Sequence, residues 1–162
     1  MGNKAYSLGL YEKSMPNHLN WKEKLTEAKE AGYDSVEISI DETDEKLERL
    51  TNKALQQEIK EAIREVGLPV LTMCLSGHRR FPIGHPDQAI RDRGMEIFYQ
   101  AIDLADFLGI RIIQLAGYDV YYEEGSEETA KLFEENLPKG IEYAAVKGIV
   151  CGFETRETEF MN

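Results

Sequence analysis

The stretch that decides the fold of this chain is IVCGFET, at residues 149–155. A short apolar run between a glycine, here Gly148, and a polar segment is typical of a buried β-strand. In folds with parallel strands, ligands bind at the carboxyl ends of those strands. Glu154 is the carboxylate at that end of this stretch. We therefore expect Glu154 to have a catalytic or metal-binding role.

Upstream of this stretch, a unit made of a strand and then a helix occurs four times. Glycines that end helices open the strands, as left-handed residues after a helix often do. These glycines, Gly32, Gly67, Gly109 and Gly148, lie 35, 42 and 39 residues apart. The expected strands cover residues 6–10, 33–40, 68–75, 110–117 and 149–155, and the expected helices cover 21–31, 52–66, 87–108 and 127–147.

Local signals mark two of these helices. Asn20 and Glu23 are spaced as a capping pair at the start of the first helix. Pro138 and Gly140 lie inside the fourth helix, and we expect them to kink or split it.

The alternation of strands and helices predicts an α/β fold with right-handed crossovers and a parallel sheet. The strands are nearly continuous apolar runs, which is typical of sheets covered on both faces. No glycine-rich phosphate fingerprint follows the first strand, which argues against a dinucleotide-binding fold. An open doubly wound sheet and part of an eight-stranded barrel both fit this pattern. Because only seven residues follow Thr155, we favour a single domain over residues 1–162 that forms the first five strands of a TIM barrel and lacks its C-terminal units.

Composition limits the classes of partner. The net charge of −11 argues against nucleic acid, because a binding surface must neutralise phosphates. No apolar run approaches the ~18 residues that span a membrane, and the N-terminus lacks the apolar core of a signal peptide. Cys74 and Cys151 lie in apolar runs, as buried free thiols in a reducing compartment do. We expect a cytoplasmic protein that binds neither nucleic acid nor membrane.

Polar residues lie in the carboxyl-terminal parts of the expected strands or directly after them: Tyr11, Glu12, Lys13, Glu37, Ser39, Asp41, Ser76, His78, Arg79, Arg80, Gln114, Tyr118, Asp119 and Glu154. Such a rim of acids, cations and an imidazole suits a polar, polyhydroxylated ligand. His78 and Arg79 could bind a phosphate or sugar hydroxyls, or belong to a solvated loop. Glu37 points away from its apolar neighbours, and either a structural or a functional role fits it. The acidic run at 41–48 is expected to be a solvated loop and helix start.

Four segments resemble a known enzyme family. They are GLYEK (9–13), VEISIDETDEKLERL (36–50), MCLSGHRRFPIG (73–84) and IQLAGYDVYY (113–122). Together they resemble the L-ribulose-5-phosphate 3-epimerases, also called L-xylulose-5-phosphate 3-epimerases or hexulose-6-phosphate isomerases. These are isomerases with xylose-isomerase-like TIM barrels, and they act on a small sugar phosphate.

The resemblance implies a divalent metal, zinc or manganese, held by a Glu that ends the fifth strand and by an Asp, a His and a Glu from later strands. Only the first of these matches a position here, Glu154, since the others would lie beyond Asn162. Such a metal stabilises an enediolate while two carboxylates exchange the C3 proton. Glu154 would then be both a metal ligand and an acid/base group, and His78 and Arg79 would orient the substrate.

Two other functions stay open: an aldose–ketose sugar-phosphate isomerase of the same superfamily, and a non-catalytic remnant that binds a sugar phosphate or self-associates. Five strands cannot close a barrel, and open edge strands favour pairing. We therefore expect a homo-oligomer, and we expect the 162-residue chain alone to be inactive. A truncated gene product, an N-terminal part prepared separately and a half-barrel completed by another chain would each explain the pattern.

Overall fold

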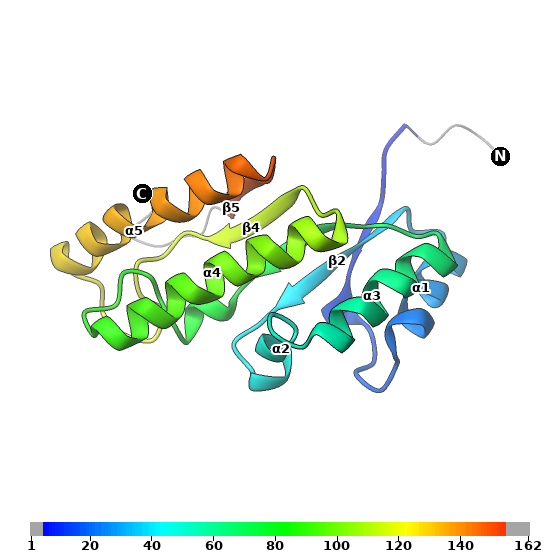
Figure 1. The fold of residues 1–162 in the computed structure, drawn as a ribbon, viewed down its shortest axis with the longest axis horizontal. Helices are drawn as coiled ribbons and strands as arrows, with labels where there is room; N and C mark the ends of the chain where they lie inside the picture. The colour runs from blue at the N-terminus through cyan, green and yellow to red at the C-terminus, as the bar shows by residue number, and fades with distance from the viewer. Residues whose placement is uncertain (1–4, 155–162) are drawn as a thin grey trace.

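The computed structural model describes residues 5–154, which form a five-stranded parallel sheet with helices packed along it (Figure 1). The strands are β1 (Gly9–Tyr11), β2 (Ser35–Ile40), β3 (Val70–Leu75), β4 (Ile112–Ala116) and β5 (Val150–Glu154). The helices are α1 (Trp21–Glu30), α2 (Asp44–Glu48), α3 (Lys53–Val66), α4 (Gln88–Leu108) and α5 (Glu127–Val146), with 3₁₀ turns η1 (Glu12–Ser14) and η2 (Gly77–Arg79). The predicted α/β class is confirmed.

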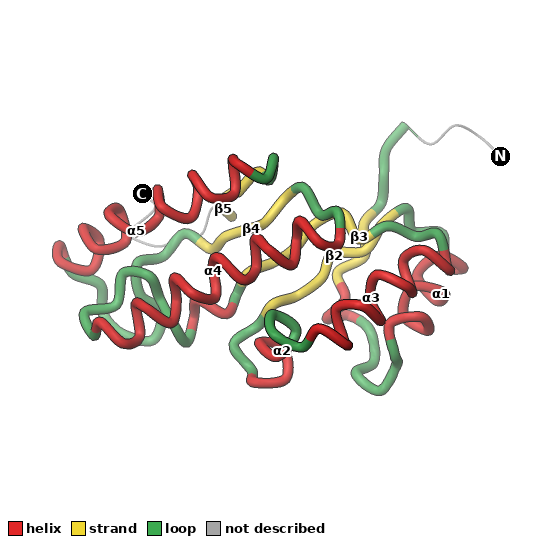
Figure 2. Tube along the Cα trace, viewed as in Figure 1, coloured by secondary structure: helices red, strands yellow, loops and turns green. Residues whose placement is uncertain are grey.

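The order of the strands decides between the two predicted architectures. The sheet runs β1-β2-β3-β4-β5, and each neighbouring pair is parallel. A sheet that grows in one direction through right-handed crossovers keeps its helices on one face, whereas a doubly wound sheet reverses and has helices on both. Figure 2 shows the helices along the same side of the strands. The sheet is therefore a segment of a barrel wall.

The two faces of the sheet differ in burial. We call the face under the helices the covered face and the opposite one the open face. Ile113 points into the covered face and is fully buried, whereas its neighbour Ile112 is 47% exposed on the open face. Val150, in register with Ile112, is 63% exposed. The expectation of a sheet covered on both faces is therefore wrong for residues 5–154, because the helices cover one face alone.

The local signals at the helix ends are confirmed. Gly32, Gly67, Gly109 and Gly148 all have positive φ, between 66° and 86°, as the exit from each helix requires. Asn20 accepts a hydrogen bond from the backbone of residue 23, whose side chain accepts one in return, which completes a capping box.

The helix start expected in the acidic run at 41–48 is present as α2, capped by Thr43. Two local predictions need correction. The first strand is shorter than expected, Gly9–Tyr11 instead of residues 6–10. Helix α5 runs unbroken through Pro138, so the expected split is wrong. Gly140 serves close packing instead of a break, because a Cβ there would lie 2.1 Å from Cε1 of Phe98 on α4. None of the helices within residues 5–154 has the length and apolar character needed to cross a membrane.

Candidate functional site

The carboxyl edge of the sheet carries a row of polar side chains. Glu154 ends β5 in register with Ala116 of β4. Phe153 packs against Phe133 of α5, with ring centroids 6.4 Å apart, so alternation turns Glu154 to the open face. Glu154 is exposed there.

The same edge holds Ser76 after β3, two strands from β5, and Asp41 after β2, three strands from β5. The Ser76 hydroxyl donates a 3.1 Å hydrogen bond to Oδ1 of Asp41, and Lys13 forms an ion pair with Oδ2. Burial raises the pKa of Asp41, but the hydrogen bond and charge of Lys13 outweigh it and hold that pKa below its ordinary value. Asp41 is thus an ionised carboxylate that joins the ends of β1, β2 and β3.

Below this row, the open face of the sheet carries further polar side chains. The Tyr11 hydroxyl donates to Oγ of Ser39 at 3.2 Å, and Oγ1 of Thr72 donates to Glu37 at 2.7 Å. Glu37 therefore has a structural partner within the sheet. Burial raises the pKa of the Cys74 thiol, and the carboxylates of Glu37 and Glu154 raise it further.

His78 and Arg79 are adjacent in η2, yet they point to different surroundings. His78 is buried: its Nε2 donates to the carbonyl of Gly94 on α4 at 3.1 Å, and its ring meets Phe98 edge-on. Burial lowers the pKa of His78 to about 4. Arg79 instead lies near the β4–α5 loop, with its guanidinium carbon 5.2 Å from the ring centroid of Tyr121. The structure therefore brings Arg79, but not the ring of His78, to the rim.

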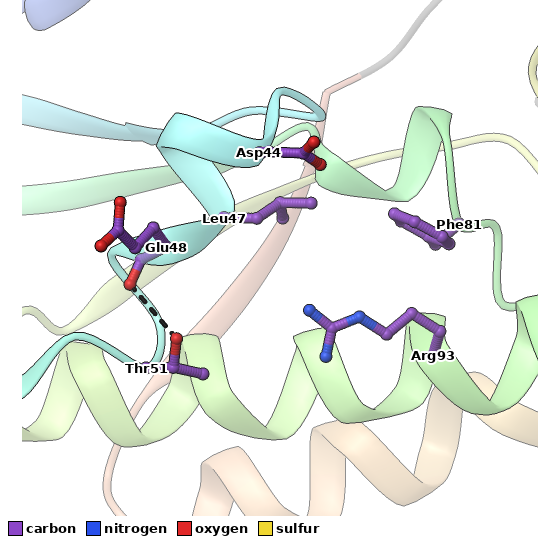
Figure 3. Close-up of a pocket in the computed structure, with 6 residues that line it drawn as sticks. All are labelled: Asp44, Leu47, Glu48, Thr51, Phe81 and Arg93. Carbon is purple, nitrogen blue, oxygen red and sulfur yellow. Dashed lines mark hydrogen bonds between the residues drawn. The ribbon is translucent and has the colours of Figure 1, made fainter.

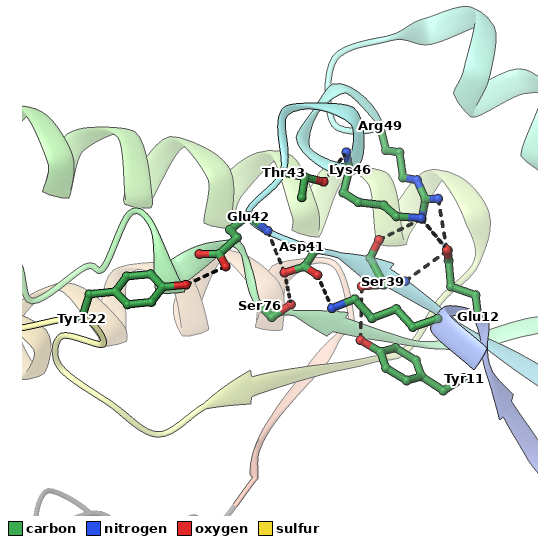
Figure 4. Close-up of polar contacts among 11 residues, drawn as sticks. Tyr11, Glu12, Ser39, Asp41, Glu42, Thr43, Lys46, Arg49, Ser76 and Tyr122 are labelled. Atoms are coloured by element: carbon green, nitrogen blue, oxygen red, sulfur yellow. Dashed lines mark hydrogen bonds and ion pairs between the residues drawn. The ribbon is translucent and has the colours of Figure 1, made fainter. Parts of the chain in front are cut away.

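Two of the expected rim acids are structural. The Glu12 side chain is fully buried and accepts hydrogen bonds from Lys46 at 2.9 Å and from Arg49 (Figure 4). Nζ of Lys24 lies 3.6 Å from the same carboxylate. Asp119 is also buried, and it accepts a hydrogen bond from Thr129 near the start of α5. Both interpretations as rim residues are corrected for the same reason: these carboxylates point into the protein, where other residues satisfy them.

A contact between loops was missed by the sequence analysis. The hydroxyl of Tyr122, after β4, donates to Oε1 of Glu42, after β2, at 2.7 Å (Figure 4). It connects residues 80 positions apart, and no local pattern signals it. The supposedly solvated run at 41–48 thus contributes to the rim.

The cavities do not coincide with Glu154. One of about 300 Å³ lies between α2 and α4, lined by Asp44, Leu47, Glu48, Thr51, Phe81 and Arg93 (Figure 3). Another, of about 570 Å³, is lined by residues 118–121, residues 123–127 and Ala130. Neither includes the carboxylate at the end of β5. The candidate site is therefore the carboxyl edge of the sheet on its open face. The described strands form one side of this site.

The residues between 5 and 154 do not fit a metal ion as a complete site. They contain no group of three or more His, Cys, Asp or Glu side chains placed to hold one. Glu154 could contribute one oxygen ligand, and tight binding of a divalent ion needs several.

Comparison with known proteins identifies the family, since residues 25–162 match the xylose isomerase-like TIM barrel family. The chain belongs to this family. It is 49% identical over 158 residues to SgbU of Escherichia coli (strain K12), a match that covers 97% of the chain and 55% of SgbU. It is 44% identical over 163 residues to the L-ribulose-5-phosphate 3-epimerase UlaE of Salmonella heidelberg (strain SL476), covering 100% of the chain and 57% of UlaE. This confirms the predicted resemblance to isomerases of the L-ribulose-5-phosphate 3-epimerase type.

Solved structures of two epimerases share the fold. A D-psicose 3-epimerase crystallised with D-fructose has a TM-score of 0.74 at 15% identity, covering 97% of this chain and 54% of that protein. An L-ribulose 3-epimerase has a TM-score of 0.66 at 22% identity, covering 90% and 48%. The chain thus spans about half the length of the proteins that it matches, including its curated relatives.

Proposed function

We propose that this chain supplies the first five strands of a barrel enzyme that inverts C3 of a ketopentose phosphate, interconverting L-ribulose 5-phosphate and L-xylulose 5-phosphate. The identity of 44% to a named L-ribulose-5-phosphate 3-epimerase over the whole chain supports the substrate class. The observation that carries the proposal is the position of Glu154, an exposed carboxylate that ends β5 on the open face. We propose a cytoplasmic location for the enzyme.

The proposed chemistry is proton exchange next to a carbonyl. The C3 proton of the ketose is acidic because the C2 carbonyl delocalises the charge as an enediolate. Glu154 accepts this proton, and a second acid, from outside residues 5–154, returns a proton on the opposite face. A positioned carboxylate of this kind contributes roughly 10²–10⁴-fold in rate. Asp41 and Glu37 are less suited to that role, since Lys13 and Thr72 already occupy them.

A divalent metal, zinc or manganese, is part of the proposal with Glu154 as one of its ligands. The described residues do not complete such a site, and the other ligands must come from further strands. For the same reason we propose that the chain alone is inactive. The edge strands β1 and β5 have free sides within the described sheet, which supports the proposal that the chain self-associates.

The test is a reconstitution assay. The purified chain is incubated with L-ribulose 5-phosphate and zinc or manganese in deuterated water, alone and with the carboxyl-terminal part of Salmonella UlaE that has no counterpart in this chain. We expect deuterium at C3, detected by NMR, only in the mixture, and we expect Glu154→Gln to abolish it. Turnover by the chain alone would overturn the proposed inactivity, and label at C1 or C2 would identify an aldose–ketose isomerase instead.

A further inference from the structure

Helices α4 and α5 share a hollow of about 540 Å³ on their exposed surface. It is lined by Tyr99, Lys139, Glu142, Tyr143 and Val146, which we call the α4–α5 patch. Val146 is 85% exposed, the highest value among the large apolar side chains of residues 5–154. Tyrosines are enriched where proteins bind one another, and two of them lie here beside an exposed apolar side chain. The composition of the patch is therefore that of a contact surface.

Other exposed apolar side chains are explained by the fold or by their neighbours. Ile112 and Val150 lie on the open face, which the proposed barrel would enclose. Phe107 has the ammonium of Lys60 over its ring, 4.0 Å from the centroid. A completed barrel has its helices as an outer ring, so it would leave Val146 as exposed as it is here. The α4–α5 patch thus needs an explanation other than completion of the barrel.

The aromatic part of the patch is held in place before any partner binds. The rings of Tyr99 and Tyr143 meet edge-on, with centroids 5.3 Å apart. The Tyr143 hydroxyl donates to Oδ1 of Asp103 at 2.7 Å, and Nζ of Lys147 lies 5.3 Å from the centroid of the Tyr143 ring. Lys147 is itself paired with Asp103 at 3.1 Å. A partner would therefore not have to order these rings, which lowers the entropic cost of association.

The charges of the patch are complementary to a second copy of the same patch. Lys139 donates to Oδ1 of Asn136 at 2.8 Å, but neither Lys139 nor Glu142 makes an ion pair within residues 5–154. In a contact between two copies related by a two-fold axis, every contact between two different residues occurs twice. An axis that passes between Lys139 and Glu142 places the lysine of each copy opposite the glutamate of the other. One cation and one acid also keep the patch neutral in a chain with a net charge of −11, so two copies can approach there without repulsion.

We propose that the α4–α5 patch is the contact surface of a two-fold dimer of this chain, with Tyr99, Tyr143 and Val146 at its apolar centre and two Lys139–Glu142 ion pairs across it. The inference rests on the proposed function for the expectation that the chain self-associates, but not for the epimerase chemistry. It also differs from pairing at the edges of β1 and β5. A two-fold contact uses the same patch on both copies and ends at a dimer, whereas pairing of β5 with β1 of the next copy can continue.

The test follows association of the 162-residue chain without substrate. Sedimentation equilibrium from micromolar to millimolar concentration gives the dissociation constant, and amide chemical shifts in NMR over the same range locate the contact. We expect a monomer–dimer equilibrium, with shifts that depend on concentration at Tyr99 and at residues 139–147. Val146→Asp should weaken the dimer at least tenfold. Lys139→Glu and Glu142→Lys should each weaken it at least fivefold, whereas the double exchange should return within threefold of the wild type, because the ion pairs form again in the opposite order.

Two matched controls separate this surface from others. Val150→Asp places the same charge on an exposed valine of the open face, and Glu58→Lys makes the same charge change as Glu142→Lys on the exposed surface of α3. Both should stay within threefold of the wild type, and circular dichroism melts confirm that each variant folds.

Three results would overturn the proposal. They are a wild type that stays monomeric throughout the range, a Val146→Asp variant that dimerises as the wild type does, and a Val150→Asp variant that loses as much as Val146→Asp. A double exchange as weak as its single variants would likewise exclude the proposed ion pairs. None of these measurements involves turnover, so failure of the dimer contact and failure of the epimerase function are distinguishable.

Discussion

The covered and open faces of the sheet place the same residue type in different surroundings. Glu12 and Glu154 both lie where a strand reaches the carboxyl edge. Glu12 follows the open-face residue Tyr11, so it turns towards the helices and is enclosed by Lys24, Lys46 and Arg49. Glu154 lies two residues after Gly152 and turns to the open face. The face towards which each of these two carboxylates points thus decides whether it lies among buried cations or at the exposed edge of the sheet.

The largest expected effect comes from removing the charge of Glu12. Glu12→Gln leaves three buried cations without a counter-charge, and we expect a loss of about 3–5 kcal/mol in the free energy of unfolding. Urea denaturation measures it. The same change at the other face, Glu154→Gln, is the matched control and should alter stability by less than about 0.5 kcal/mol. Equal losses in the two variants would contradict the distinction between the faces.

Substitution of two neighbouring isoleucines tests the difference in burial between the two faces without changing any charge. Ile113→Ala removes a fully buried side chain from the covered face and should lower the free energy of unfolding by about 2–5 kcal/mol. Ile112→Ala, on the open face, should lower it by less than about 1 kcal/mol, because that side chain is half exposed. A comparable loss at Ile112 would mean that the open face is covered in solution, and sedimentation at several concentrations would then show whether a second copy covers it.

The smallest expected effect is a dependence of the stability on pH, and it comes from the buried side chain of His78. The pKa of His78 is about 4 in the folded chain, against 6.5 ordinarily, because burial disfavours the imidazolium. Between these values the unfolded chain binds the extra proton, so stability is complete above pH 6.5 and falls as the pH drops towards 4. We expect a loss of about 2 kcal/mol between pH 7.5 and pH 5.

Urea denaturation at several pH values measures this slope. His78→Gln should remove it, although the variant itself is less stable at neutral pH. His18→Gln, which changes a histidine in an exposed loop, should retain the full slope. An unchanged slope in His78→Gln would show that His78 is not the group that titrates.

The backbone was largely predictable from the sequence, because glycines with positive φ mark the ends of regular units at a nearly constant spacing. The position of Glu154 at the carboxyl end of β5 was predicted from the strand pattern. The face of Glu12 was not predicted, since β1 has only three residues and gives little pattern to follow. The separation of His78 from Arg79 depends on a 3₁₀ turn, and the Tyr122–Glu42 bond depends on a long-range contact. Both are decided by tertiary packing, which leaves no local signal.

The strand order has a consequence for how the chain is made. Every strand pairs with strands that precede or follow it directly in the chain, so each pairing joins residues about one strand–helix unit apart. Synthesis delivers the amino-terminal units first. Each new strand that leaves the ribosome therefore already has a sheet partner in the part of the chain made before it.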